Sequence, residues 1–199
     1  MDHESRAAVR RLALVLLFGG AASPAFAHTI EGAGGFAAGF AHPLLGPDHL
    51  VAMVAVGLWG AFLGPPAIVL LPITFPLVMA LGGVIGIAGL PLPATETAIA
   101  LSAIVLGLMV ALAARPPLWL AALTVGAFAI FHGYAHGREL PDDANAVAFA
   151  AGFVIATGLL HLTGIAFGLL TRWPAGRIAV RAAGGGIALV GIGYLGGLL

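Results

Sequence analysis

The chain has 199 residues, of which 61% are hydrophobic and 8% are charged, and eight acidic residues balance eight basic ones. Soluble domains carry roughly a quarter charged residues, so this composition excludes a soluble domain and indicates an integral membrane protein. The zero net charge without a basic patch argues against nucleic acid as a partner. The absence of cysteine excludes disulfides, thiolate metal sites and iron–sulfur clusters.

The first segment, residues 1–27, is typical of a cleavable secretory signal. Arginines near its start precede an apolar core at 12–22, and a proline and small residues follow up to Ala27. This core of about 11 residues is too short to span a bilayer, which favours cleavage over the alternative of an uncleaved anchor. Cleavage makes His28 the mature N-terminus and predicts one membrane domain, 28–199.

Breaks made of proline, glycine and rare charged residues divide the mature chain into six predicted membrane-spanning helices. The predicted fold class is therefore all-α, a polytopic membrane helix bundle. A Gly/Ala-rich segment, 32–41, is a candidate short or re-entrant helix before the first span. Loops this short make neighbouring helices antiparallel. The predicted spans are 44–63, 66–88, 95–114, 118–137, 145–171 and 178–198.

The distribution of arginine predicts the orientation. Six spans that start outside leave both mature termini outside, and four arginines then fall on the inner side: Arg115, Arg172, Arg177 and Arg181. Only Arg138 falls outside, so the positive-inside rule is satisfied. Together with the signal segment, this predicts a multi-pass protein of a prokaryotic inner membrane with a periplasmic mature N-terminus.

Residues of metal-ligand type collect in the outer half of this topology. His132 and His136 stand one helical turn apart, so both imidazoles face the same way, about 6 Å apart at Cβ, and can converge on one ion. His42 and His49 are too far apart on a regular helix, but the prolines and glycine between them favour a bent segment that folds them together. The candidate ligands are His28, His42, Asp48, His49, Glu96, His132, His136, Glu139 and His161.

Several of these residues also have a purely structural interpretation. His132 and His136 could satisfy backbone carbonyls, Glu96 could cap a helix or lie at the water interface, and His161, deeper in its span, could form an interhelical hydrogen bond. The abundant glycines favour close helix packing over any phosphate-binding role. Against the structural interpretation, ionisable groups in lipid are expensive and usually mark a pathway or a site.

Two motifs carry a resemblance to a known family. The run from His42 to Trp59, which begins His-Pro-Leu-Leu-Gly-Pro-Asp-His, resembles the signature of the HupE/UreJ family of nickel/cobalt permeases, and residues 131–139 look like its second signature. The resemblance implies nickel or cobalt uptake that serves enzymes such as hydrogenase or urease. The resemblance also implies a set of metal-binding residues: His42, Asp48, His49, His132, His136 and Glu139. The His-x5-Asp-His spacing is one residue longer than the His-x4-Asp-His element of the larger nickel/cobalt transporter family, so kinship with that group is weaker.

The resulting hypothesis is a secondary permease whose substrate is Ni²⁺ or Co²⁺, with Zn²⁺ as a further alternative and with no cofactor. An enzyme is not expected, because Gly133 stands where the general-base Glu of His-Glu-x-x-His would stand, and Ser102 lacks a Gly-x-Ser-x-Gly context. A non-transporting metal-binding or metallochaperone accessory protein remains the alternative. The partners expected are the metal ion and the lipid bilayer, while a homo-oligomer and metalloenzyme-maturation partners stay open.

Overall fold

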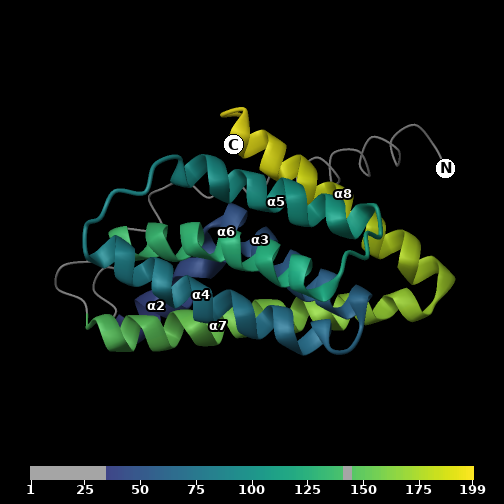
Figure 1. Cartoon of the computed structure of the whole chain (residues 1–199), viewed down its shortest axis with the longest axis horizontal. Helices are drawn as coiled ribbons and strands as arrows, with labels where there is room; N and C mark the ends of the chain where they lie inside the picture. The colour runs from purple at the N-terminus through teal and green to yellow at the C-terminus, as the bar shows by residue number, and fades with distance from the viewer. Residues whose placement is uncertain (1–34, 141–144) are drawn as a thin grey trace, which may run out of the picture. The chain divides into compact units, whose positions relative to one another are not determined.

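A computed structural model describes residues 35–140 and 145–199, and every regular element within these ranges is helical (Figure 1). The all-α fold class is thus confirmed for the described residues. The predicted signal segment and His28 lie outside them. The elements are α2 (Gly35–Leu45), α3 (Pro47–Leu63), α4 (Ala67–Ile87), α5 (Thr95–Ala111), α6 (Leu118–Arg138), α7 (Ala146–Gly168), the 3-10 helix η2 (Leu169–Arg172) and α8 (Pro174–Leu195).

Four helical segments in the described ranges are long and apolar enough to cross a membrane: α4, α6, α7 with η2, and α8. The pair α2 and α3 meets these criteria only when taken together, as one segment bent by 80°. Helix α5 has 17 residues and spans about 26 Å, less than the roughly 30 Å of a bilayer core. These residues therefore hold four or five candidate spans, and the sixth stays a prediction.

The first predicted span begins differently from expected. Pro43 does not separate α2 from α3; it lies inside α2, and the break falls at Gly46. Pro47 then takes the first turn of α3, where its missing N–H costs no hydrogen bond and its fixed φ suits a helix. The candidate re-entrant helix is α2, which places His42 on α2 and His49 on α3 across the 80° bend.

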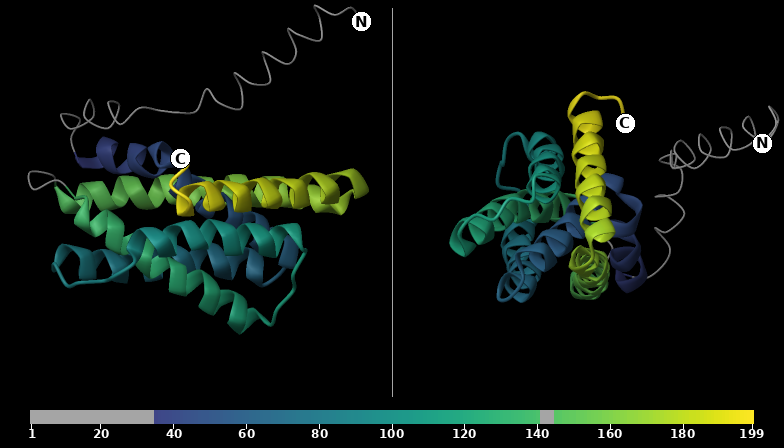
Figure 2. Two further views of the ribbon diagram at one scale, coloured as in Figure 1. Left: turned by 90° about the horizontal axis from the view of Figure 1, so that it is seen from above. Right: turned by 90° about the vertical axis from the view of Figure 1, so that its right-hand side faces the viewer.

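Glycines allow the helices to pack backbone against backbone. Helix α4 packs on α6, α5 on α8, and both α2 and α3 on α7 (Figures 1 and 2). A Cβ atom added to Gly133 of α6 would collide with the carbonyl oxygen of Met79, and one added to Gly57 of α3 would collide with the backbone of α7. The structural interpretation of these glycines is correct, because no side chain fits at such contacts.

The two ends of the helix bundle carry different chemistry. Helix α6 ends, and α5 and α7 begin, at one end of the bundle (Figure 1), and Glu96, His136 and Glu139 lie in the first or last turns there. At the opposite end, Arg181 Nε donates to the Ala111 carbonyl at 2.7 Å and Arg177 Nε to that of Thr171 at 3.1 Å. Cationic groups at helix C-termini are favourable, since the free carbonyls there carry partial negative charge.

Candidate metal centre

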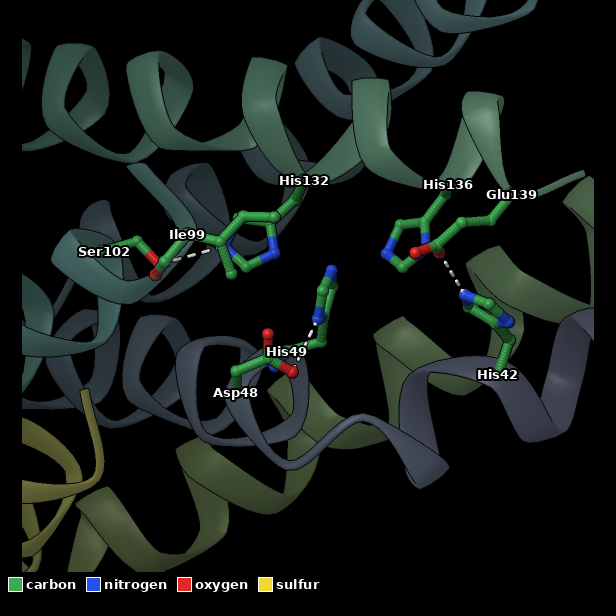
Figure 3. A network of polar contacts seen from close by, with 8 residues as sticks. All are labelled: His42, Asp48, His49, Ile99, Ser102, His132, His136 and Glu139. Carbon is green, nitrogen blue, oxygen red and sulfur yellow. Dashed lines mark hydrogen bonds and ion pairs between the residues drawn. The ribbon is translucent and has the colours of Figure 1, made fainter. Parts of the chain in front are cut away.

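Three imidazoles from two helices share one buried space. His132 and His136 project from α6 toward α3, and His49, in the first turn of α3, lies between them (Figure 3). The ring centre of His49 lies 4.8 Å from that of His132 and 4.5 Å from that of His136. All three are buried, His132 completely. The predicted convergence of the two α6 histidines on one space is thus present, with a partner from the other motif.

Asp48 orients His49. Asp48 Oδ1 accepts a hydrogen bond from the backbone N–H of His49 at 2.8 Å and lies 2.8 Å from its Nδ1 (Figure 3). An ionised carboxylate can only accept, so Nδ1 carries the proton and Nε2 keeps a free lone pair. Within the described residues, Nε2 is buried without a hydrogen-bond partner. A carboxylate that fixes the tautomer of a histidine is the usual support of a metal ligand.

Ser102 of α5 orients His132 in the same manner. Its hydroxyl donates to the Ile99 carbonyl at 2.7 Å, so its oxygen can accept from His132 Nε2 at 2.9 Å (Figure 3). The Nδ1 lone pair of His132 then remains, buried and without a partner in the described part of the chain. Sequence reasoning considered Ser102 only as a nucleophile and missed this contact.

Replacing Ser102 with alanine should weaken Ni²⁺ binding to the purified protein by roughly 10–100-fold, the usual cost of losing the partner of a metal ligand. The imidazole would lose the acceptor that fixes its tautomer. Ser102→Thr retains the hydroxyl and should stay within a few-fold of the original dissociation constant. Isothermal titration calorimetry would measure both variants. Equal affinity for Ser102→Ala would show that the serine does not position His132.

A second group adjoins this cluster at its outer edge. Glu139 Oε2 lies 2.9 Å from His42 Nε2 and 3.6 Å from His136 Nδ1. One ligand atom from each of these three residues lies within 4.8 Å of the others. Burial alone would raise the pKa of the Glu139 carboxyl, but its contacts with His136 and His42 outweigh this and hold the pKa well below its usual range. Glu139 is therefore anionic at neutral pH, as a cation site requires.

The structural alternative for the α6 pair finds no support in these contacts. His132 bonds the hydroxyl of Ser102, and neither nitrogen of His136 has a hydrogen-bond partner among the described residues. Neither histidine therefore satisfies a backbone carbonyl there. Buried polar atoms almost always find a partner, so each exception calls for an explanation such as an ion or water.

Glu96 and His161 belong to neither of these two groups, although Glu96 shares a pocket with Asp48. Glu96 is exposed and lines, together with Asp48 and Tyr194, a pocket of about 290 Å³ between the start of α5 and the end of α8. His161 of α7 is buried and packs against Phe75 of α4, which also contacts His132. The structure thus gathers His42, Asp48, His49, His132, His136 and Glu139, and leaves Glu96 and His161 outside this set.

Comparison with known proteins extends over nearly the whole chain. The family model described as HupE / UreJ protein matches residues 14–194. Protein HupE of Rhizobium leguminosarum bv. viciae is 48% identical over 176 residues, which cover 87% of this chain and 92% of that protein. No solved structure matches the chain.

Proposed function

The chain belongs to the HupE/UreJ family, and from this premise we propose that it is a permease that takes up nickel or cobalt. The observation that carries the proposal is a set of buried imidazole nitrogens without a hydrogen-bond or ion-pair partner among the described residues: Nε2 of His49, Nδ1 of His132 and Nε2 of His136. Leaving several polar atoms unpaired in one apolar interior is costly. A divalent transition-metal ion would satisfy them together, and imidazole suits Ni²⁺, Co²⁺ and Zn²⁺.

The candidate ligands become more buried from Glu139 to His132, and this order suits stepwise loss of water by the metal ion. Half-exposed Glu139, anionic and paired with His42, would capture the hydrated ion. The ion would then exchange water for imidazole at His136, His49 and finally the fully buried His132. Closely spaced sites favour passage because each holds the ion long enough to dehydrate it and weakly enough to release it.

The two ends of the helix bundle support an orientation in the membrane and an energy source for uptake. We place the ligand end outside and the arginine end inside, with the bent pair α2–α3 and the short helix α5 as the first and third of six spans after signal cleavage. The positive-inside rule supports this placement, since Arg177 and Arg181 lie at the arginine end. An inside-negative potential of 100 mV would then contribute about 4–5 kcal/mol for a doubly charged ion, at about 2.3 kcal/mol per charge.

Competition among metals tests the proposal. Cells that express the chain alone should accumulate radioactive nickel, and excess cobalt should suppress this uptake while excess magnesium should not. Mg²⁺ prefers an octahedral shell of oxygens and retains its water, so an imidazole cluster would discriminate against it. Zinc should fall between the two, because tetrahedral His and carboxylate sites suit it.

Two outcomes would contradict the proposal. Equal competition by magnesium and cobalt would mean that the imidazoles do not select the ion. Nickel accumulation no greater than in cells without the gene, together with nickel binding by the purified protein, would favour the non-transporting accessory protein instead.

A further inference from the structure

Helix α7 carries two buried polar side chains that the outer cluster does not use. Thr157 and His161 are one helical turn apart and therefore on the same face, and both are almost completely buried. The hydroxyl of Thr157 and both ring nitrogens of His161 have no hydrogen-bond partner among the described residues. Three unpaired polar atoms on adjacent turns call for a common explanation.

The free hydroxyl of Thr157 is a particular property of this threonine. Exposed threonines in the same bundle donate to the carbonyl four residues earlier: Thr163 to Leu159 and Thr124 to Leu120, both at 2.8 Å. This local bond is the usual way for a threonine to satisfy its hydroxyl inside a helix. Thr157 does not form it, so its hydroxyl remains available to a ligand.

Helix α4 offers an oxygen at the same place. Pro76 has no N–H, so the carbonyl of Pro72, four residues earlier, lacks its normal helical donor. The His161 ring lies beside the backbone of Pro72 but does not meet the geometry of a hydrogen bond with it. Its centre is 5.5 Å from the ring of Phe75 on the same helix. An imidazole and a free carbonyl therefore lie side by side between α4 and α7, and the Thr157 hydroxyl lies one turn away on the same face of α7.

His161 lies about one turn deeper than His132, and Thr157, four residues after Phe153, lies at about the depth of His132. Phe153 of α7 packs against His136, at 4.2 Å between ring centres. His161 follows Phe153 by eight residues, about 12 Å along α7, whereas His132 lies four residues, about 6 Å, inward of His136 on the antiparallel α6. The ring of Phe75 contacts both His132, at 5.4 Å, and His161.

We propose that Thr157, His161 and the Pro72 carbonyl form a second, inner binding station for a divalent transition-metal ion, and that Phe75 separates it from the outer cluster. The identity of the ion rests on the proposed function. One imidazole with two neutral oxygens is a poorer donor set than the outer imidazoles and carboxylate, so the inner station binds more weakly. Such a gradient favours onward release, and the aromatic face of Phe75 tolerates a passing cation.

Metal counting on the purified full chain tests the inner station. Equilibrium dialysis against Ni²⁺ should give two ions per chain for the unmodified protein and one, the tighter, for His161→Ala. In the reverse experiment, the double variant His132→Ala/His136→Ala should retain one weakly bound ion, and adding His161→Ala should remove it.

The variant Thr157→Val distinguishes loss of an ion-binding group from loss of folding. The substitution keeps the shape and removes a buried hydroxyl without a partner, so the protein should unfold at the same or a higher temperature. It should nevertheless weaken the second binding step by roughly ten-fold or more. Thr163→Val is the matched control on the same helix and should leave both binding steps unchanged.

The results of these binding experiments test the inner station independently of nickel transport. Binding curves of His161→Ala and Thr157→Val that superimpose on that of the unmodified protein would overturn the inner station, even where nickel uptake is observed. If the chain takes up no nickel but His161→Ala still loses one ion, the station stands and the permease does not.

Discussion

Replacing His132 or His136 with alanine should reduce nickel accumulation to that of cells without the protein. Each side chain supplies a buried nitrogen to the space around His49, and each removal leaves a cavity in place of a donor. Loss of a direct ligand should exceed the roughly 10–100-fold cost of losing a supporting partner. Uptake of radioactive nickel, normalised to the amount of protein in the membrane, measures the effect.

Thr124→Ala is the matched control because it lies on the same helix. Its hydroxyl bonds only the Leu120 carbonyl within the described residues and is exposed, so uptake should not change. Full nickel uptake by a double variant, His132→Ala/His136→Ala, present at normal levels in the membrane would contradict the ligand assignment. The pair would then be interior histidines without a transport role.

The sequence could predict the cluster because its signals are local. A spacing of four residues places His132 and His136 on one face whatever else the helix contacts. Proline and glycine between His42 and His49 predicted the bend that brings both rings to His136. Ser102 had no such signal, since one serine in an apolar helix shows no spacing relative to a histidine thirty residues away.

Helix boundaries were predictable where proline or charge marks the end of an apolar run. The span predicted at 118–137 is α6, Leu118–Arg138, and that at 66–88 is α4, Ala67–Ile87. Helix α5 is shorter than its prediction, because Ala113 adopts a left-handed backbone conformation with φ of 56°. Alanine seldom does so, and neither its type nor its spacing reveals this termination.

The observed contacts of Asp48 and His161 differ most from the ligand role predicted for them. Asp48 was predicted as a candidate ligand from its motif and its residue type, and His161 from its residue type. In the structure, Asp48 Oδ1 is engaged by the backbone and ring of His49, and His161 lies against Phe75 and not in the outer set. Residue type identifies a donor, but only tertiary packing decides which donors meet. Their contact with an ion therefore stays a prediction.

Gly133→Ala should destabilise the protein by about 1–3 kcal/mol or more, the usual cost of overpacking. The added methyl group would meet the carbonyl oxygen of Met79 and the backbone nitrogen of Gly83, and neither can move unless α4 separates from α6. Thermal unfolding in detergent, followed by loss of helical circular dichroism, measures the change. Nickel uptake should fall as well, because His132 is the neighbouring residue and shifts with α6.

Gly126→Ala on the same helix should instead stabilise the protein. Its methyl group would lie 3.7 Å from a side-chain methyl of Val78 and 3.8 Å from that of Thr74, which are ordinary contacts. Replacing a helical glycine by alanine then gains up to about 1 kcal/mol of helix propensity. If Gly133→Ala and Gly126→Ala unfolded at the same temperature, the result would contradict the close contact between α4 and α6 at Gly133. The position of His132 and His136 relative to His49 depends on that packing, so the arrangement of the metal centre would fall with it.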